Sequence, residues 1–288
     1  MNVFIFGAGN VGRSLAAALA EAGVEVTLVP ARRGVPTHRI DASVVILAVR
    51  DPEIPRAASA LAEARIVTRR AIVVHCAGSL SEEALAPLRP QCAGVAQMHP
   101  LLSFASGEQP PSFAGANAQV QGDRVAVRRV RTLAKKLGMM PRTFEQLDPV
   151  GYHASAVLVA NGAATLAALA AELLVSSGVP AEEAPRMLGP LLRSVAENVE
   201  ALGLPHALTG PIRRGDAEGV ARQIATLKRR FPKALPLFFA SANAQLPLAR
   251  EIGHATDAEL REVRECLEKS STPRKSSAVR RKRDRPLA

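Results

Sequence analysis

Three glycines near the N-terminus, Gly7, Gly9 and Gly12, have a spacing that suits the binding of a phosphate-bearing ligand. They follow a short apolar run and precede an Ala- and Leu-rich helical pattern. In such a strand, turn and helix, the first glycine makes the turn, the second lets the backbone approach a pyrophosphate and the third lets helix and strand pack closely. Free N–H groups at the helix start then face the phosphates. We expect this turn to bind a dinucleotide through Gly7, Ala8, Gly9, Asn10, Val11 and Gly12.

The residues after the second expected strand, Val24 to Val29, indicate which dinucleotide binds. An NAD-preferring site usually has an acidic residue here to hold the ribose 2′-hydroxyl, whereas arginine accommodates a 2′-phosphate. This chain has Arg32 and Arg33 and no acid. The pattern therefore favours NADP over NAD, and solvated loop charges are the alternative interpretation.

Polar side chains follow several later apolar runs. Ser43 to Val49 ends in Ala48 and Val49, His75 follows the run from Ala71, and His99 and Ser103 follow the run from Gly94. Continuous apolar runs are typical of parallel strands covered on both faces, and ligands bind at the carboxyl ends of such strands. We expect Ala48, Val49 and His75 to contact the cofactor. His99 and Ser103 either contact a ligand or, since Pro100 follows His99, only hold a loop.

The strand pattern stops at Pro149, and Val150 to Ser176 reads as one long helix. No charged residue occurs from Ala154 to Ala171, which predicts a helix in a buried core or a dimer interface. A membrane span is not expected, because alanine is weakly apolar and polar residues interrupt the run. His153 and Asn161 lie on one i, i+4 row and could line a cleft or hydrogen-bond to neighbouring helices.

Shorter patterns organise the remainder of the chain. Arg186 to Leu202 has helical apolar spacing, and a turn rich in Gly, Pro and Arg follows. In that turn Thr209 and Arg213 could bind a substrate carboxylate. Arg213 could instead bind a cofactor phosphate or pair with an acid on a neighbouring helix. Asp216 is placed to cap the next helix, and Thr256 with Glu259 forms a capping box for the last one.

These patterns predict an α/β protein with a doubly wound, mostly parallel Rossmann sheet at 1–148, followed by an all-helical domain at 149–269. Residues 270–288 hold seven of the Lys and Arg residues and one Asp, so they predict a disordered basic tail. The body is only mildly basic and aromatic residues are few, so nucleic acid is not an expected partner. No C-x-x-C pair, no metal site and no secretion signal is expected, which favours a reduced, cytoplasmic setting.

Four motifs together resemble a bacterial family that joins an NADP-oxidoreductase-like Rossmann domain to a helical domain of unknown function, number 2520. They are the glycine turn, His99-Pro100 with Ser103-Phe104, Tyr152-His153-Ala154 with Asn161, and Thr209-Gly210-Pro211 with Arg214-Gly215-Asp216. The family is related to the 6-phosphogluconate and 3-hydroxyisobutyrate dehydrogenases and to the pyrroline-5-carboxylate and ketopantoate reductases. The resemblance implies a helical homodimer and hydride transfer to or from a small-molecule substrate.

The chain departs from the hydroxyacid dehydrogenases at one position. Those enzymes have a catalytic Lys four residues before an Asn, and aligning that Asn with Asn161 puts Val157 at the Lys position. His153, one turn earlier, is the expected substitute acid/base because histidine titrates near neutral pH. Two functions therefore remain open: an NADP-dependent reductase or dehydrogenase, and an NADP(H)-binding sensor or interaction module without chemistry.

Overall fold

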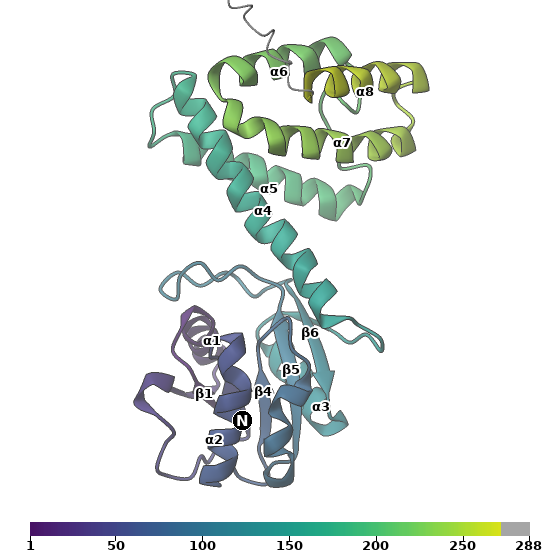
Figure 1. Ribbon diagram of the computed structural model, residues 1–288. Helices are drawn as coiled ribbons and strands as arrows, with labels where there is room; N and C mark the ends of the chain where they lie inside the picture. The colour runs from purple at the N-terminus through teal and green to yellow at the C-terminus, as the bar shows by residue number, and fades with distance from the viewer. Residues whose placement is uncertain (272–288) are drawn as a thin grey trace, which may run out of the picture. The chain divides into compact units, whose positions relative to one another are not determined.

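A computed structural model describes residues 1–271 and divides the chain into two units, Met1–Gly162 and the residues from Ala163 on (Figure 1). This division falls inside helix α4 (Pro149–Ser176), whereas the sequence places the domain boundary just before that helix. Residues 270 and 271 end helix α8 (Asp257–Ser271). The rest of the predicted basic tail lies outside the described residues.

The first unit contains a seven-stranded sheet in the order β2-β1-β3-β4-β5-β6-β7. Neighbouring strands are parallel except β5 and β6, which run antiparallel. The predicted α/β fold with a mostly parallel sheet is confirmed. The strands are β1 (Asn2–Phe6), β2 (Glu25–Val29), β3 (Val44–Leu47), β4 (Ile72–His75), β5 (Gly94–Pro100), β6 (Asn117–Gly122) and β7 (Met140–Arg142).

Helices cover both faces of this sheet, which explains the continuous apolar strands. Alternate residues of β1 enter two different apolar clusters, Val3 and Ile5 on one face and Phe4 and Phe6 on the other. The first cluster includes residues of α1 (Asn10–Glu21) and α3 (Arg124–Lys136). The second includes residues of α2 (Ile54–Ala64) and the 3₁₀ segment η3 (Glu82–Gln91). Two shorter 3₁₀ segments, η1 (Ala31–Arg33) and η2 (Asp51–Glu53), follow β2 and β3.

The second unit has its apolar core among three helices, α6 (Ala217–Arg230), α7 (Leu235–Ile252) and α8, with the 3₁₀ segment η4 (Pro232–Ala234) between α6 and α7. Both predicted helix starts are confirmed. Asp216 Oδ1 accepts a hydrogen bond from the backbone N–H of Gly219 at 2.7 Å. Thr256 and Glu259 form the reciprocal bonds of a capping box.

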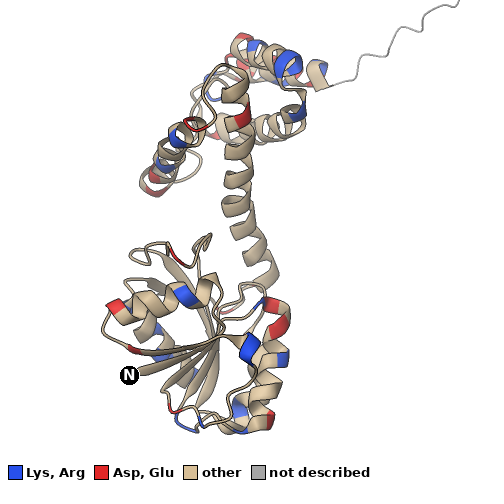
Figure 2. Cartoon of the chain, turned by 90° about the vertical axis from the view of Figure 1, so that its left-hand side faces the viewer, with Lys and Arg blue, Asp and Glu red and all other residues tan. Residues whose placement is uncertain are grey.

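Helix α4 does not meet the expectation of a buried core helix, because none of its residues is buried in the single chain. It is the one helix among residues 1–271 that is long and apolar enough to cross a membrane, and Figure 2 shows few charges along it. Helix α5 (Ala184–Leu202) likewise buries only Ala184 and exposes Leu191 and Leu202 by more than half. The sequence correctly shows these helices to be apolar, but the described residues, 1–271, leave them largely exposed.

Candidate functional site

The glycine turn has the geometry that its spacing predicts. Gly7 has a φ of +122°, and a Cβ there would lie 2.3 Å from the carbonyl oxygen of Ala48. A Cβ on Gly12 would lie 1.9 Å from the carbonyl oxygen of Gly7, so only glycine lets α1 approach the turn this closely. A Cβ on Gly9 would meet nothing within 4 Å. The turn therefore leaves open space beside Gly9, at the start of α1, where a phosphate could approach the backbone.

A hollow of about 300 Å³ opens beside this turn. It brings together six of the residues predicted to bind the cofactor, from the ends of β1, β2 and β3: Gly7, Ala8, Gly9, Arg32, Ala48 and Val49. It also contains two arginines that the sequence analysis missed, Arg13 and Arg50, and one acid, Glu53, which pairs with Arg50 at 2.5 Å. Arg50 directly follows Val49, which is predicted to contact the cofactor, so the sequence did contain a signal for Arg50. Three arginines against one acid make this hollow suited to an anionic ligand.

Other predicted cofactor residues lie outside the lining of this hollow. Val11 packs against the apolar cluster under α1, and Arg33 is exposed at the end of η1. The side chain of Asn10 instead binds a loop, because Nδ2 donates to the carbonyl oxygens of Phe104 and Ala105, each at 3.1 Å. Asn10 thus connects the start of α1 to the segment that follows β5.

The structure gives His75 a role different from the predicted cofactor contact. Its side chain is fully buried, Nδ1 accepts from the backbone N–H of Ala77 at 3.2 Å, and Nε2 lies 2.9 Å from the carbonyl oxygen of Ser81. Burial lowers the pKa of His75, so the ring is neutral and Nε2 donates to that carbonyl. Both nitrogens are occupied by backbone groups. His75 therefore shapes the turn after β4 and has no nitrogen left for a ligand.

A second cluster forms where the ends of β4 and β5 meet the first turns of α4, all within the first unit. Nδ1 of His99 lies 3.2 Å from the hydroxyl of Tyr152, and the His99 and His153 ring centroids are 5.9 Å apart. Both imidazoles pack on Gly78, where a Cβ would lie 2.6 Å from Nδ1 of His153 and 2.8 Å from Nε2 of His99. The structure thus brings together two of the predicted catalytic residues. Tyr152 and Gly78 were not predicted as site residues.

Burial dominates the electrostatics of this cluster. It lowers the pKa of His99 to about 4, with a smaller contribution from His153 in the same direction and an opposing one from Asp51. Burial also raises the pKa of Tyr152, so its hydroxyl keeps its proton. Burial raises the pKa of Cys76, next to this edge, to about 12, which disfavours the reactive thiolate.

The remaining predicted residues have other surroundings. Ser103 is exposed on the loop between His99 and Phe104, and Asn161 lies eight residues beyond His153 on α4, about 12 Å along the helix. Thr209 and Arg213 belong to the second unit. Arg213 Nη1 donates to the carbonyl oxygen of Leu208 at 2.7 Å, so this guanidinium braces its own turn.

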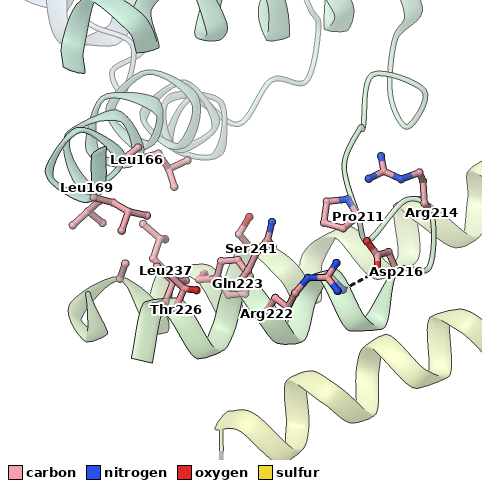
Figure 3. Close-up of a pocket in the computed structure, with 16 residues that line it drawn as sticks. Leu166, Leu169, Pro211, Arg214, Asp216, Arg222, Gln223, Thr226, Leu237 and Ser241 are labelled. Atoms are coloured by element: carbon pink, nitrogen blue, oxygen red, sulfur yellow. Dashed lines mark hydrogen bonds between the residues drawn. The ribbon is translucent and has the colours of Figure 1, made fainter. Parts of the chain in front are cut away.

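The second unit contains a hollow of about 710 Å³ between α4, α6 and α7 (Figure 3). Its apolar side chains include Leu166, Leu169 and Phe238, and its charged residues include Arg214 and Arg222. Arg222 pairs with Glu218 on its own helix at 2.8 Å. Among residues 1–271, no group of three or more His, Cys, Asp or Glu could hold a metal ion.

Comparison with known proteins agrees with this architecture. Residues 34–100 match a Rossmann-like domain, and residues 117–244 match a domain of unknown function, DUF2520. The chain therefore matches a Rossmann-like model and, further along, a DUF2520 model, in the order that the sequence predicts. The comparison with curated proteins found no match.

Solved structures share the fold over nearly their whole length. The Thermotoga maritima protein TM1727 is 22% identical, with 86% of this chain and 99% of that chain covered and a TM-score of 0.66. A candidate NADP oxidoreductase from Bacteroides fragilis is 20% identical, with 88% and 97% covered and a TM-score of 0.64. Plasmodium falciparum pyrroline carboxylate reductase with NADP bound is 11% identical, with 94% and 97% covered and a TM-score of 0.56.

Proposed function

We propose that the protein is an NADP-dependent oxidoreductase that transfers a hydride between NADP(H) and a small, carboxylate-bearing hydroxy, keto or imine substrate. One observation carries the proposal: the glycine turn after β1 and the histidine pair near the ends of β4 and β5 lie at the same edge of one sheet. The NADP-bound reductase that shares the fold supports the choice of cofactor.

The residues present fit this cofactor. The open backbone at Gly9 and the start of α1 would hold the pyrophosphate, and Arg32 would hold the ribose 2′-phosphate. When bound, a nicotinamide cofactor supplies or accepts the hydride. Arg13 and Arg50 add positive charge to the same hollow, which compensates the charge of a phosphate-rich ligand.

His153 is the proposed acid/base. When hydride adds to a carbonyl carbon, the carbonyl oxygen takes up a proton, and the reverse reaction releases it. Nδ1 of His153 is buried against Gly78 without a hydrogen-bond partner, so Nε2 is the nitrogen that would exchange this proton. His99 and Ser103 would approach the substrate from the carboxyl end of β5.

We also propose a cytoplasmic homodimer formed through the helical unit. Exposed apolar residues recur at helical spacing on α5, including Met187, Leu191 and Val195, and α4 buries no residue. Such faces are costly to leave in water, and a second copy would cover them.

Light scattering should show a dimer at micromolar concentration, and Leu191→Asp should yield monomers. Arg193→Asp is the matched control, because Arg193 is a charged, exposed residue of the same helix; a monomeric wild type contradicts the proposal.

The test of function is a screen of 2- and 3-hydroxyacids, keto acids and cyclic imines for a change in NADPH absorbance. His153→Ala should lower kcat at least about 100-fold, since general acid/base catalysis commonly contributes that much. A kcat within about twofold of wild type would remove His153 from the chemistry. Tight NADPH binding without turnover of any substrate would favour the sensor instead, a function compatible with Val157 at the position of the dehydrogenase Lys.

A further inference from the structure

The hydroxyl of Tyr152 has one polar neighbour in the histidine cluster, Nδ1 of His99, at 3.2 Å. The two rings meet edge to face, with centroids 5.5 Å apart and an interplanar angle of 84°. Tyr152 lies in the first turns of α4 and His99 near the end of β5, so the bond joins elements 53 residues apart. It fixes where the histidine ring lies relative to the helix.

The direction of this bond determines where His99 carries its proton. A neutral imidazole has one N–H and one nitrogen lone pair, and a phenol hydroxyl donates readily to such a lone pair. Burial keeps His99 uncharged near neutral pH and keeps the Tyr152 hydroxyl protonated. If Tyr152 donates to Nδ1, the proton of His99 must be on Nε2.

Gly78 makes room for that nitrogen at the ligand edge of the sheet. Any larger residue at position 78 would place its Cβ 2.8 Å from Nε2 of His99, in the space that the two imidazoles now occupy. Nδ1 of the neighbouring His153 lies against Gly78 and makes no hydrogen bond to the Tyr152 hydroxyl. Gly78 thus borders both Nδ1 of His153 and Nε2 of His99, while Nδ1 of His99 faces the Tyr152 hydroxyl.

We propose that Tyr152 is a positioning residue: its hydroxyl donates to Nδ1 of His99 and holds the ring as the tautomer with the proton on Nε2, which then donates to an oxygen of the substrate. This inference rests on the proposed oxidoreductase function and narrows its substrate class. A carbonyl oxygen has lone pairs that accept such a bond, whereas the protonated imine that accepts a hydride has none on nitrogen. The site therefore selects keto and hydroxy substrates over cyclic imines.

The experiment that tests the tautomer does not need a substrate. The full-length protein labelled with ¹⁵N in its histidines gives the protonation of each ring nitrogen by long-range ¹H–¹⁵N NMR, and His99→Gln identifies the signals of His99. In the wild type we expect an unprotonated Nδ1 and a protonated Nε2. Tyr152→Phe removes the donor and should produce a mixture of both tautomers. Ser155→Ala, one turn along α4, is the matched control, because Ser155 bonds only to the carbonyl oxygen of Tyr152.

A proton on Nδ1 of His99 in the wild type, or an unchanged tautomer in Tyr152→Phe, would overturn the proposal. The wild-type spectrum decides this even if the variant unfolds. NADPH binding is measured separately by calorimetric titration. If the proposed function is wrong, this titration shows it, whereas the NMR result on the His99 tautomer is unaffected. In the substrate screen, Tyr152→Phe should lower kcat about 2- to 12-fold with little change in KM. This range of kcat corresponds to the loss of one neutral hydrogen bond. Turnover of cyclic imines and of no keto acid would refute the substrate class.

Discussion

Arg32 and Arg33 are adjacent in the sequence but differ in position, and this difference makes a sharp prediction. Arg32 lines the hollow beside the glycine turn, whereas Arg33 is not part of that lining, and both side chains are exposed. From the sequence alone, both arginines are expected to bind the cofactor. The structure predicts that Arg32→Ala weakens NADPH binding and that Arg33→Ala changes it little.

The size of the effect follows from the contact that Arg32 would make. A charge-assisted hydrogen bond contributes about 1.5–3 kcal/mol, and the lower end applies here because the site is open to water and salt screens it. About 1.5 kcal/mol corresponds to roughly a tenfold rise in the dissociation constant. NADH lacks the 2′-phosphate, so its affinity should change less than about twofold in either variant.

Calorimetric titration of wild type, Arg32→Ala and Arg33→Ala with NADPH and with NADH measures these affinities. Repeating the NADPH titrations at higher ionic strength should shrink the difference between wild type and Arg32→Ala, because salt screens exposed charges. Equal wild-type affinities for the two cofactors would refute the reasoning. So would an equal loss for both cofactors in Arg32→Ala, which would place the arginine on the pyrophosphate and not on the ribose.

Three further predictions concern stability. Gly12→Ala should destabilise the first unit by about 1–3 kcal/mol and lower Tm, because the new Cβ would overlap the carbonyl oxygen of Gly7. Gly9→Ala should leave Tm unchanged and weaken only NADPH binding, because a Cβ there meets no neighbouring atom. Equal losses of Tm in the two variants would contradict this prediction. Asp216→Ala should cost about 1 kcal/mol through loss of the α6 cap, and an unchanged urea midpoint would contradict this. His99 has a pKa of about 4 when folded and about 6.5 when unfolded, so its contribution to stability should fall as the pH drops from 6.5 toward 4. His99→Gln should reduce the Tm loss over that range, and an unchanged loss would contradict it.

Local sequence patterns predicted the elements of this protein well. Strands β3 and β4 follow from apolar runs because both faces of a parallel sheet are covered, so nearly every side chain in them must be apolar. The caps at Asp216 and Thr256 follow from contacts within three residues. The glycine turn follows from steric needs that only glycine meets.

Contacts between distant residues were not predictable in the same way. A histidine after an apolar run is compatible with both a ligand contact and a structural bond, and only the turn geometry shows that His75 makes the second kind. The partnership of Tyr152 and His99 depends on where α4 begins relative to the end of β5, which no periodicity encodes. The lack of charge on α4 indicates that the helix is apolar, but it does not indicate whether the same chain or another molecule covers the helix.

The two hydrogen bonds from Asn10 to the loop at Phe104 and Ala105 have a consequence for how ligands affect one another. This loop leads back along the chain to Ser103 and His99, while Asn10 begins the helix whose N-terminus faces the proposed phosphate position. A molecule that binds at α1 and stiffens its first turn also restrains the loop. Because such coupling is reciprocal, a second molecule held by the loop must strengthen the first by the same factor. Through these two bonds, Asn10 would couple the two proposed binding positions.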